Sequence, residues 1–235
     1  MKYLIVNADD FGASDGINRG IVDGHRLGIV TSTSAMVTGR RIAEAVALSR
    51  ECPGLSIGLH WDVWGEDERE FDLTDLAAVR DEFRRQLDHF EALFQRVPTH
   101  VDSHRHAHRE AHVRPLFREL VAPLDVPLRD EGSVRFVGGF YAQWEWLVTN
   151  LDYVSVPFLQ QLLRDEVADG WTEVSCHPGY VTPDFQSIYL TEREAELRTL
   201  IDPRIRETVR ELAIRLVNYD DHRRLTIGAR GASRA

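Results

Sequence analysis

The sequence predicts an α/β fold whose sheet is parallel and either open or closed into a barrel. Short apolar segments, typical of strands buried on both faces, alternate along the chain with segments whose apolar residues recur every three or four positions, as in helices. This alternating order favours a parallel sheet. The length of 235 residues is that of one α/β barrel, so we expect a single domain over residues 1–235.

The predicted strands are short, and the first begins almost at the N-terminus. Tyr3–Asn7 is a continuous apolar segment that ends in polar residues. Ile29–Val37 is rich in Val, Thr and Ser, and its Val and Thr residues favour strands. The remaining predicted strands are Leu55–His60, Thr99–Asp102, Val126–Leu128 and Thr172–His177.

The predicted helices lie between and after these strands. Thr191–Glu194 fits a capping box at a helix start, and Asp202-Pro203 places a capping acceptor before a proline. The basic tail from about residue 222 is expected to form a final element with a frayed end. The longest helix presents Leu76, Val79, Phe83, Leu87, Phe90 and Phe94 on one face, and shorter apolar stripes contain Ile17, Ile21 and residues 113–120.

Composition and charge exclude several classes of protein. The net charge of −10 disfavours nucleic acid and anionic membrane surfaces as partners. The two cysteines, Cys52 and Cys176, do not indicate a disulfide framework. The chain enters a strand directly and contains no apolar segment as long as a membrane span, so we expect a cytoplasmic protein.

Residues 99–108 read Thr-His-Val-Asp-Ser-His-Arg-His-Ala-His and contain four of the ten histidines. Imidazole is the commonest metal ligand among side chains. The segment taken alone also fits a solvated loop, so its meaning depends on what lies at the other strand ends. In a strand, one face would present His100, Asp102, His104, His106 and His108.

Other predicted strands also end in residues that bind metals or move protons. Asp9-Asp10 follows the first strand, and His60 and His177 end later ones. Active sites of α/β folds gather at the carboxyl ends of the strands. Two buried neighbouring carboxylates repel unless a cation or hydrogen bonds offset the cost, so a divalent ion would explain Asp9 and Asp10 together. The alternative is that one of them caps the following helix, a role for which Ser14 competes.

These motifs together resemble the YdjC-like carbohydrate deacetylases, a family that includes chitooligosaccharide deacetylases. The resemblance implies a distorted (β/α) barrel of the glycoside hydrolase/deacetylase type. Residues 61–67 depart from the family's usual segment after GLH, which affects the choice of oligosaccharide. The motifs are LIVNADDFG at Leu4–Gly12, GIVTSTS at Gly28–Ser34, GLH at Gly58–His60, THVDSHRHAH at Thr99–His108 and CHPGY at Cys176–Tyr180, followed by Tyr189 and REAEL at Arg193–Leu197.

The resemblance also implies a site. Asp10, His60 and His104 would bind one divalent metal ion, which is magnesium by resemblance, although the ligand types also suit zinc. Asp9 would be the general base and His177 the general acid. His106 and His108 are further candidates, either as ligands or as support for ligands.

The implied activity is hydrolysis of the N-acetyl group of an acetylated amino sugar or short oligosaccharide, by a homodimer. A metal-assisted phosphoester hydrolase and a non-catalytic metal-binding protein are the alternatives. Asp9 and His177 are not needed merely to hold a metal, so they favour an amide hydrolase.

Aromatic residues near the motifs are candidates for contact with a sugar ring. Trp61 follows His60, and Tyr141 and Trp144 lie in the aromatic segment 138–146. Arg129, beside Glu131, fits a role in orienting Asp9 or in binding substrate, and the pair also fits a surface ion pair. Each aromatic residue could instead serve packing or a dimer interface.

Overall fold

The computed structural model describes residues 1–65, 70–145 and 147–232. Its centre is a seven-stranded sheet in the order β4-β3-β2-β1-β6-β5, with β7 beside the first residues of β1. The pairs formed by these seven strands in the described part of the chain are all parallel, as predicted. The strands are β1 (Lys2–Phe11), β2 (Ser32–Ala35), β3 (Ser56–Trp61), β4 (Val101–Ser103), β5 (Val134–Val137), β6 (Gly170–Cys176) and β7 (Ile214–Leu216).

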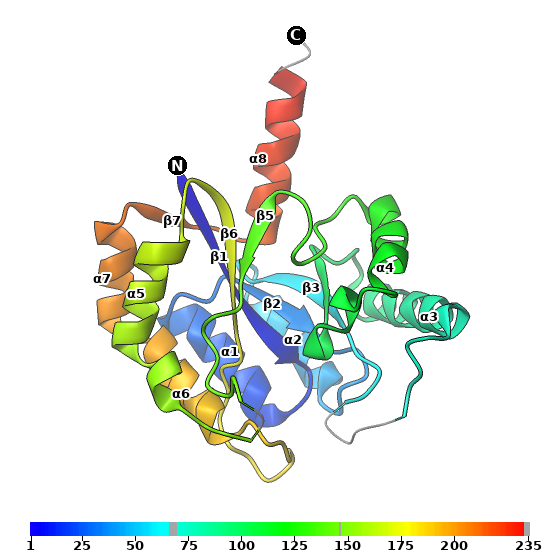
Figure 1. The fold of residues 1–235 in the computed structure, drawn as a ribbon, viewed down its shortest axis with the longest axis horizontal. Helices are drawn as coiled ribbons and strands as arrows, with labels where there is room; N and C mark the ends of the chain where they lie inside the picture. Colours follow the sequence, from blue (N-terminus) through cyan, green and yellow to red (C-terminus); the bar gives the residue numbers. More distant parts are fainter. Residues whose placement is uncertain (66–69, 146, 233–235) are drawn as a thin grey trace.

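Helices surround the sheet (Figure 1). One group, α5, α6 and α7, lies on one side of the sheet, and α3 and α4 lie on the other. Among the described residues no strand pair joins β5 to β4, so the sheet forms an incomplete barrel. The helices are α1 (Asp15–Leu27), α2 (Ile42–Glu51), α3 (Leu76–Phe94), α4 (Arg114–Val121), α5 (Val156–Glu166), α6 (Thr191–Leu200), α7 (Pro203–Glu211) and α8 (Tyr219–Ala232).

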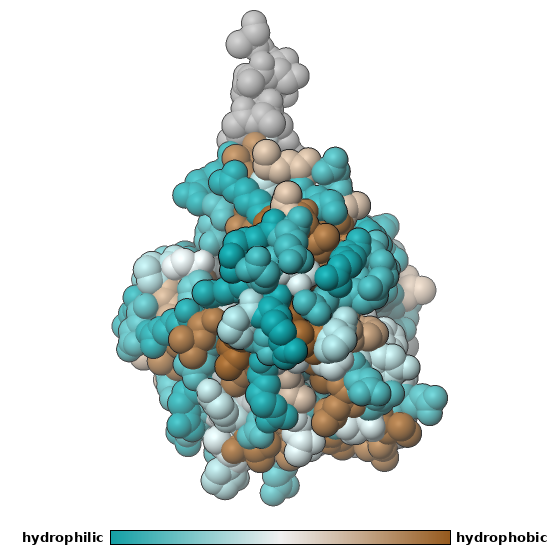
Figure 2. Space-filling view, turned by 90° about the vertical axis from the view of Figure 1, so that its left-hand side faces the viewer, coloured by the Kyte–Doolittle hydropathy of each residue, from teal (hydrophilic) through white to brown (hydrophobic). Residues whose placement is uncertain are grey.

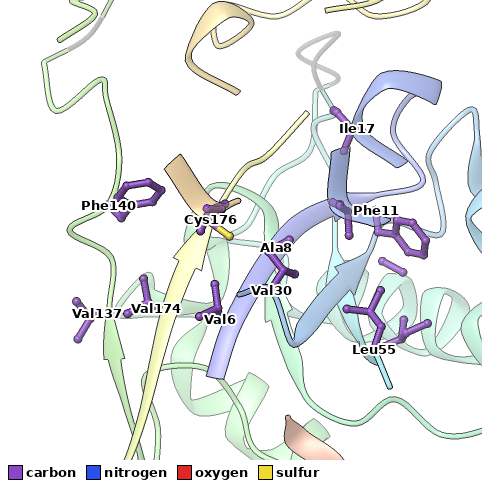
Figure 3. Packing of buried hydrophobic residues seen from close by; sticks show 14 of the residues in the cluster. Val6, Ala8, Phe11, Ile17, Val30, Leu55, Val137, Phe140, Val174 and Cys176 are labelled. Atoms are coloured by element: carbon purple, nitrogen blue, oxygen red, sulfur yellow. The ribbon is translucent and has the colours of Figure 1, made fainter. Parts of the chain in front are cut away.

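The outer face of the sheet is apolar and holds most of the hydrophobic core. Leu4, Val6 and Ala8 alternate along β1 and belong to this core, which continues into the surrounding helices. Val6 pairs in register with Val174 of β6, which pairs in turn with Val137 of β5, and Figure 3 shows these three side chains in a row. The helices are therefore held by apolar contact with the convex side of the barrel.

The inner face of the sheet is largely polar. The residues between the apolar positions of β1 include Asn7 and Asp9, which are at most 2% exposed. A second, small apolar cluster of Ile5, Val134, Val217 and Tyr219 lies apart from the main core. Other buried polar residues of the strands and their ends are Ser34, His60, His100, Asp102, Arg129 and Glu173.

Several predicted elements are confirmed. The longest predicted helix is α3, whose N-cap Asp75 accepts hydrogen bonds from two backbone amides. Asp202 caps α7 with Pro203 as its first residue, as predicted. Ser14, rather than Asp9 or Asp10, caps α1. The predicted tail element is α8, and residues 233–235 lie outside the described residues.

Other predictions are wrong. Thr191 is the first residue of α6 and makes no cap, because the cap position is Leu190. The segment Val126–Leu128 forms only an isolated bridge, between Leu128 and Val101. The strands β5 and β7 were not predicted, since each is short and is interrupted by an exposed arginine.

The histidine-rich segment is not one extended strand. β4 ends at Ser103, and His104–Arg109 forms a 3₁₀ helix with left-handed backbone at Arg105 and His106. The prediction that all its histidines share one face is therefore wrong, because the chain turns at His104.

The surface shows no extended apolar face in the view of Figure 2, where hydrophobic residues form small groups among hydrophilic ones over α5 and α7. None of the described helices is long and apolar enough to cross a membrane.

Candidate active site

A cavity of about 510 Å³ opens at the carboxyl ends of the strands. Asp9 and Asp10 at the end of β1, His60 at the end of β3 and His177 after β6 all line it. The parallel sheet thus brings together side chains from three distant parts of the chain, as the sequence predicts. His104, just after β4, completes this set.

An irregularity in β1 places two consecutive carboxylates in the cavity. The register with β2 shifts between Ala8 and Phe11, and Asp10 has a φ of 72°. In a regular strand Asp9 and Asp10 would point to opposite faces, whereas a bulge redirects one of them.

Asp9 is held by a buried arginine. The Nη1 and Nη2 atoms of Arg129 each donate to one Asp9 oxygen at 2.7 Å, and the Asn7 amide donates to Oδ1 at 2.9 Å. Burial alone would raise the pKa of Asp9, but the Arg129 guanidinium outweighs burial and leaves this pKa below its usual value. Asp9 is therefore an ionised carboxylate of fixed orientation.

Asp10 has one oxygen in an ion pair and one without a hydrogen bond. Arg193 of α6 donates to Oδ2 at 2.7 Å. Oδ1 is buried, accepts no hydrogen bond from the described residues, and lies 3.3 Å from Nε2 of His60. Burial opposes ionisation of Asp10, but Arg193 and His60 outweigh it, so its pKa lies well below the usual value. A buried anionic oxygen without a donor is suited to a cation.

His60 is oriented by Asp102, which lies behind it. Nδ1 of His60 is 2.6 Å from Oδ1 of Asp102, whose Oδ2 accepts a 2.6 Å hydrogen bond from Ser34. Burial would lower the pKa of His60, but the carboxylates of Asp102 and Asp10 raise it well above its usual value. The carboxylates therefore favour the imidazolium form of this ring in the metal-free protein.

His104 is oriented in the same way by Asp62. Nδ1 of His104 is 3.0 Å from Oδ1 of Asp62. Asp62 in turn accepts hydrogen bonds from Thr38 and from the backbone of Gly65. Burial opposes ionisation of Asp62, but its contacts with His104 lower its pKa to about 2.

His177 lies between a buried glutamate and Asp9. Its Nε2 is 3.9 Å from Asp9 Oδ2, and its Nδ1 is 3.7 Å from Glu196 Oε1, an ionic contact rather than a hydrogen bond. Glu196 also accepts from the His177 backbone amide at 2.5 Å and from the Tyr189 hydroxyl at 2.5 Å. Burial would lower the pKa of His177, but Glu196, with Asp9 and Asp10, raises it.

The described residues include a group that could hold a metal ion. Asp9, His60 and Asp102 are buried and each offers one ligand atom, and these atoms lie within 4.8 Å of one another. The cavity wall thus carries metal-binding chemistry, as the histidine-rich segment indicates.

Two of the predicted aromatic residues line the cavity. Tyr141 stacks on Tyr189 with ring centroids 4.7 Å apart, and Trp144 at the cavity wall is 59% exposed. Trp146 lies outside the described residues, as do positions 66 and 67 of the segment after His60.

Three other predicted contacts need correction. Trp61 is fully buried against Phe117 and does not line the cavity, so it packs in the core. Arg129 is fully buried and does not line the cavity, so of its predicted roles the contact with Asp9 is confirmed, and the substrate contact and the surface ion pair are not. The ring nitrogens of His108 lie 2.6 Å from Ser103 Oγ and 3.2 Å from the Arg129 carbonyl, outside the cavity.

The two other histidines of the segment, His106 and His100, occupy different positions. His106 lines the cavity beside Phe136, with ring centroids 5.4 Å apart. Burial lowers the pKa of His106 to about 3, so this ring is neutral. His100 lies deeper, below Asp102, where burial lowers its pKa to about 3.

Sequence reasoning assigned no role to Asp62, Arg193 or Glu196, although the last two belong to a segment that resembles the family. Asp62 follows His60 by two positions, so strand alternation could have placed it on the same face. Arg193 and Glu196 are buried on α6, a helix whose buried side is largely charged. A charged helix face is itself a signal, because such residues are buried only when they are paired.

Comparisons with known proteins agree with this geometry. The sequence model of a family described as YdjC-like protein matches residues 3–211. A Serratia marcescens protein named chitooligosaccharide deacetylase is 33% identical over 258 aligned positions, which cover 94% of this chain and 99% of that protein.

Solved structures share the fold. A candidate cellobiose-phosphate cleavage protein from Enterococcus faecalis is 25% identical, with a TM-score of 0.78 over 94% of this chain and 98% of that chain. A family 4 carbohydrate esterase from Streptomyces lividans, in complex with acetate, is 13% identical. Its TM-score is 0.55 over 91% of this chain and 90% of that chain, so it is similar in fold alone.

Proposed function

Because the chain belongs to the YdjC-like family, we propose that it is a carbohydrate deacetylase, a metal-dependent amide hydrolase acting on an acetylated amino sugar or short oligosaccharide. The observation that carries this proposal is the placement of a fixed, ionised Asp9 beside His177 in the wall of one cavity, 3.9 Å apart at their nearest polar atoms. A carboxylate base and an imidazolium acid are the two groups that amide hydrolysis needs.

Asp10, His60 and His104 are the proposed metal ligands. The free Oδ1 of Asp10 beside Nε2 of His60 supports them. Both histidines are held through Nδ1 by a carboxylate, the usual support of an imidazole that binds metal through Nε2. These residues therefore fit a divalent ion, which would polarise the acetyl carbonyl and acidify a water molecule when bound.

The group Asp9, His60 and Asp102 fits a metal ion less well. Both oxygens of Asp9 already accept hydrogen bonds from Arg129, and Oδ2 of Asp102 is 2.7 Å from Nη2 of the same arginine. A cation bound there would face the guanidinium charge at short range, which disfavours it.

Asp9 takes the proton from the attacking water in the proposed mechanism. Arg129 and Asn7 fix the plane of its carboxylate, so the oxygen that receives the proton does not need to reorganise. The low pKa of Asp9 makes it a weak base, and it can act only on a water molecule that is already acidified.

His177 supplies the proton that the leaving amine needs. The Glu196 carboxylate keeps its imidazole protonated near neutral pH. Nδ1 of the ring contacts Glu196 and Nε2 lies near Asp9, so the proposed acid and base stand side by side at the cavity wall. The products are acetate and a free amine.

The cavity wall offers a place for a sugar ring. Tyr141 and Trp144 meet at a ring angle of 85° with centroids 6.4 Å apart. Aromatic faces pack against the C–H faces of sugars, so these two rings are the proposed substrate contacts. Magnesium as the ion, a homodimer and a cytoplasmic location stay predictions.

The test is acetate release from a panel of N-acetylated mono- and disaccharides, with and without a phosphate group, in added magnesium or zinc. We expect Asp9→Asn to keep metal affinity and to lose turnover by about a thousandfold or more, whereas His104→Ala loses both. Normal turnover by Asp9→Asn would refute its role as base. Release of phosphate without acetate would instead identify a phosphoester hydrolase.

A further inference from the structure

Tyr219, the first residue of α8, lies inside the barrel at the end opposite the cavity. It is 1% exposed, and its ring stacks on His100 with centroids 3.9 Å apart. Its backbone amide donates to Ser56 Oγ at the start of β3, and its ring packs with Ile5. The family match ends at residue 211, so Tyr219 belongs to the segment that follows it.

The Tyr219 hydroxyl begins a chain of hydrogen bonds that ends at Asp9. It donates to Oε2 of Glu173 at 2.6 Å, and Oε1 of Glu173 accepts from Nε of Arg129 at 2.8 Å. The two Nη atoms of Arg129 donate to Asp9 at 2.7 Å. This series of hydrogen bonds therefore runs through the barrel from the amino ends of the strands to their carboxyl ends.

Each contact in this series of hydrogen bonds restricts the orientation of the next side chain. The guanidinium is planar, so its contact with Glu173 through Nε sets the plane in which Nη1 and Nη2 meet Asp9. The side chains of Arg129 and Glu173 are 0% and 1% exposed, so water does not replace a lost partner. Loss of the hydroxyl would leave Oε2 of a buried carboxylate without this donor, and the carboxylate would shift to find another.

We propose that Tyr219 is a positioning residue for the reaction, which fixes the Asp9 carboxylate through Glu173 and Arg129. The proposal rests on the proposed role of Asp9 as base. Tyr219 is not among the residues that line the cavity, so we expect its hydroxyl to affect turnover through these hydrogen bonds.

The test is a double-mutant cycle between Tyr219→Phe and Glu173→Gln, with acetate release as the assay. Phe keeps the ring that stacks on His100, and only the hydroxyl is lost. We expect kcat to fall about tenfold in Tyr219→Phe, with KM changed less than about twofold, because substrate binding is not touched. In the Glu173→Gln background the same change should cost no further activity. Tyr3→Phe, in the same apolar cluster against Trp171, is the control and should keep wild-type kcat.

An NMR measurement gives a readout that needs no substrate. The ¹H–¹⁵N signal of Arg129 Nε, assigned with Arg129→Lys, should shift in Tyr219→Phe and not in Tyr3→Phe. An unchanged Arg129 signal, a wild-type kcat in Tyr219→Phe, or losses that multiply in the double variant would each overturn the proposal. Absence of acetate release by the wild type, with a shifted Arg129 signal, would count against the proposed function and not against this chain of contacts.

Discussion

His60 and His104 each use Nδ1 to contact a carboxylate, Asp102 and Asp62 respectively. Such a carboxylate sets the orientation and tautomer of the ring. The carboxylates around His60 also weaken metal binding, because they raise the pKa of the ring and favour the imidazolium. A metal ion must displace this proton before Nε2 can bind it.

Metal affinity should therefore rise with pH. The pKa of His60 in the metal-free protein lies well above its usual value, so proton competition extends through neutral pH and weakens only as the pH rises past that pKa. We expect an increase of up to about tenfold per pH unit below it, with one proton released per ion. Calorimetric titration in buffers of different ionisation enthalpy measures both quantities. An affinity independent of pH around neutrality would contradict the ligand assignment of His60.

Glu196 should set the alkaline limit of activity. The acid His177 must be protonated, so activity is present below its pKa and is lost as pH rises through it. Glu196→Gln removes the charge that raises this pKa, and the alkaline limb of kcat/KM should therefore move to lower pH, by about one unit.

The matched control for Glu196 lies on the same helix. Glu194→Gln keeps an acceptor for the backbone amide of Val181 and should leave the alkaline limb in place. If Glu196→Gln moved the limb to higher pH, or left it unchanged, His177 would not be the group that titrates there.

At the scale of elements, the contact between α1 and the loop after β6 depends on glycine. A Cβ at Gly20 would lie 2.5 Å from the Cα of Gly179, and one at Gly16 would lie 2.1 Å from the carbonyl oxygen of Tyr180. Both contacts are to backbone, which cannot rotate away. The close packing of α1 against this loop therefore fixes the position of the segment that contains His177.

Gly20→Ala should thus lower turnover although it raises intrinsic helix propensity. The added methyl group must push the loop outward and displace His177, and we expect kcat to fall about ten- to hundredfold. Gly24→Ala on the same helix meets only side chains, the nearest being Val30 Cγ2 at 3.0 Å, and should keep near-normal kcat. Equal activity of the two variants in the acetate assay would show that the loop does not depend on this contact.

Elements with a long apolar face were predictable, and those held by single contacts were not. α3 is amphipathic over its whole length, so its periodicity indicates both its existence and its bounds. Thr191–Glu194 has the letters of a capping box, but α6 packs through charged residues, and Glu192 accepts from the Leu190 amide instead. The segment after Ser103 turns because residues 105 and 106 adopt a left-handed backbone that no periodicity marks.

At the scale of the molecule, the barrel is apolar outside and polar inside, and Arg129 joins strands across its interior. Its guanidinium contacts Asp9 of β1, Asp102 of β4 and Glu173 of β6. Three carboxylates thus share one buried cation. The polar interior is stable only while this cation is present, because buried carboxylates without a partner are costly.

Replacement of Arg129 should destabilise the whole fold. We expect Arg129→Met to lower the free energy of unfolding by about 3–5 kcal/mol, since it leaves buried charges uncompensated. Arg80→Met removes a bidentate pair with Glu119 at the surface and should cost less than about 1 kcal/mol. Urea denaturation of both variants measures the difference, and similar losses would mean that the interior network adds no stability.

The sequence predicts the main positions of the site but not the contacts that support them. Asp9, Asp10, His60 and His177 lie in or just after the last residues of strands, and parallel strands end at one edge, so their convergence is predictable. Arg193 is 183 positions from Asp10, and no local pattern connects them. Arg129 was an open case because the burial of its side chain decides between an ion pair at the surface and one with Asp9.

The start of β1 and the helix α8 lie at the end of the barrel away from the cavity (Figure 1). A protein tethered to a solid support through α8 would therefore present its cavity toward the solution. Bulky or polymeric sugars could then reach the catalytic groups without obstruction by the support. Attachment through the loops beside α6 would instead press the cavity against the surface and admit only small substrates.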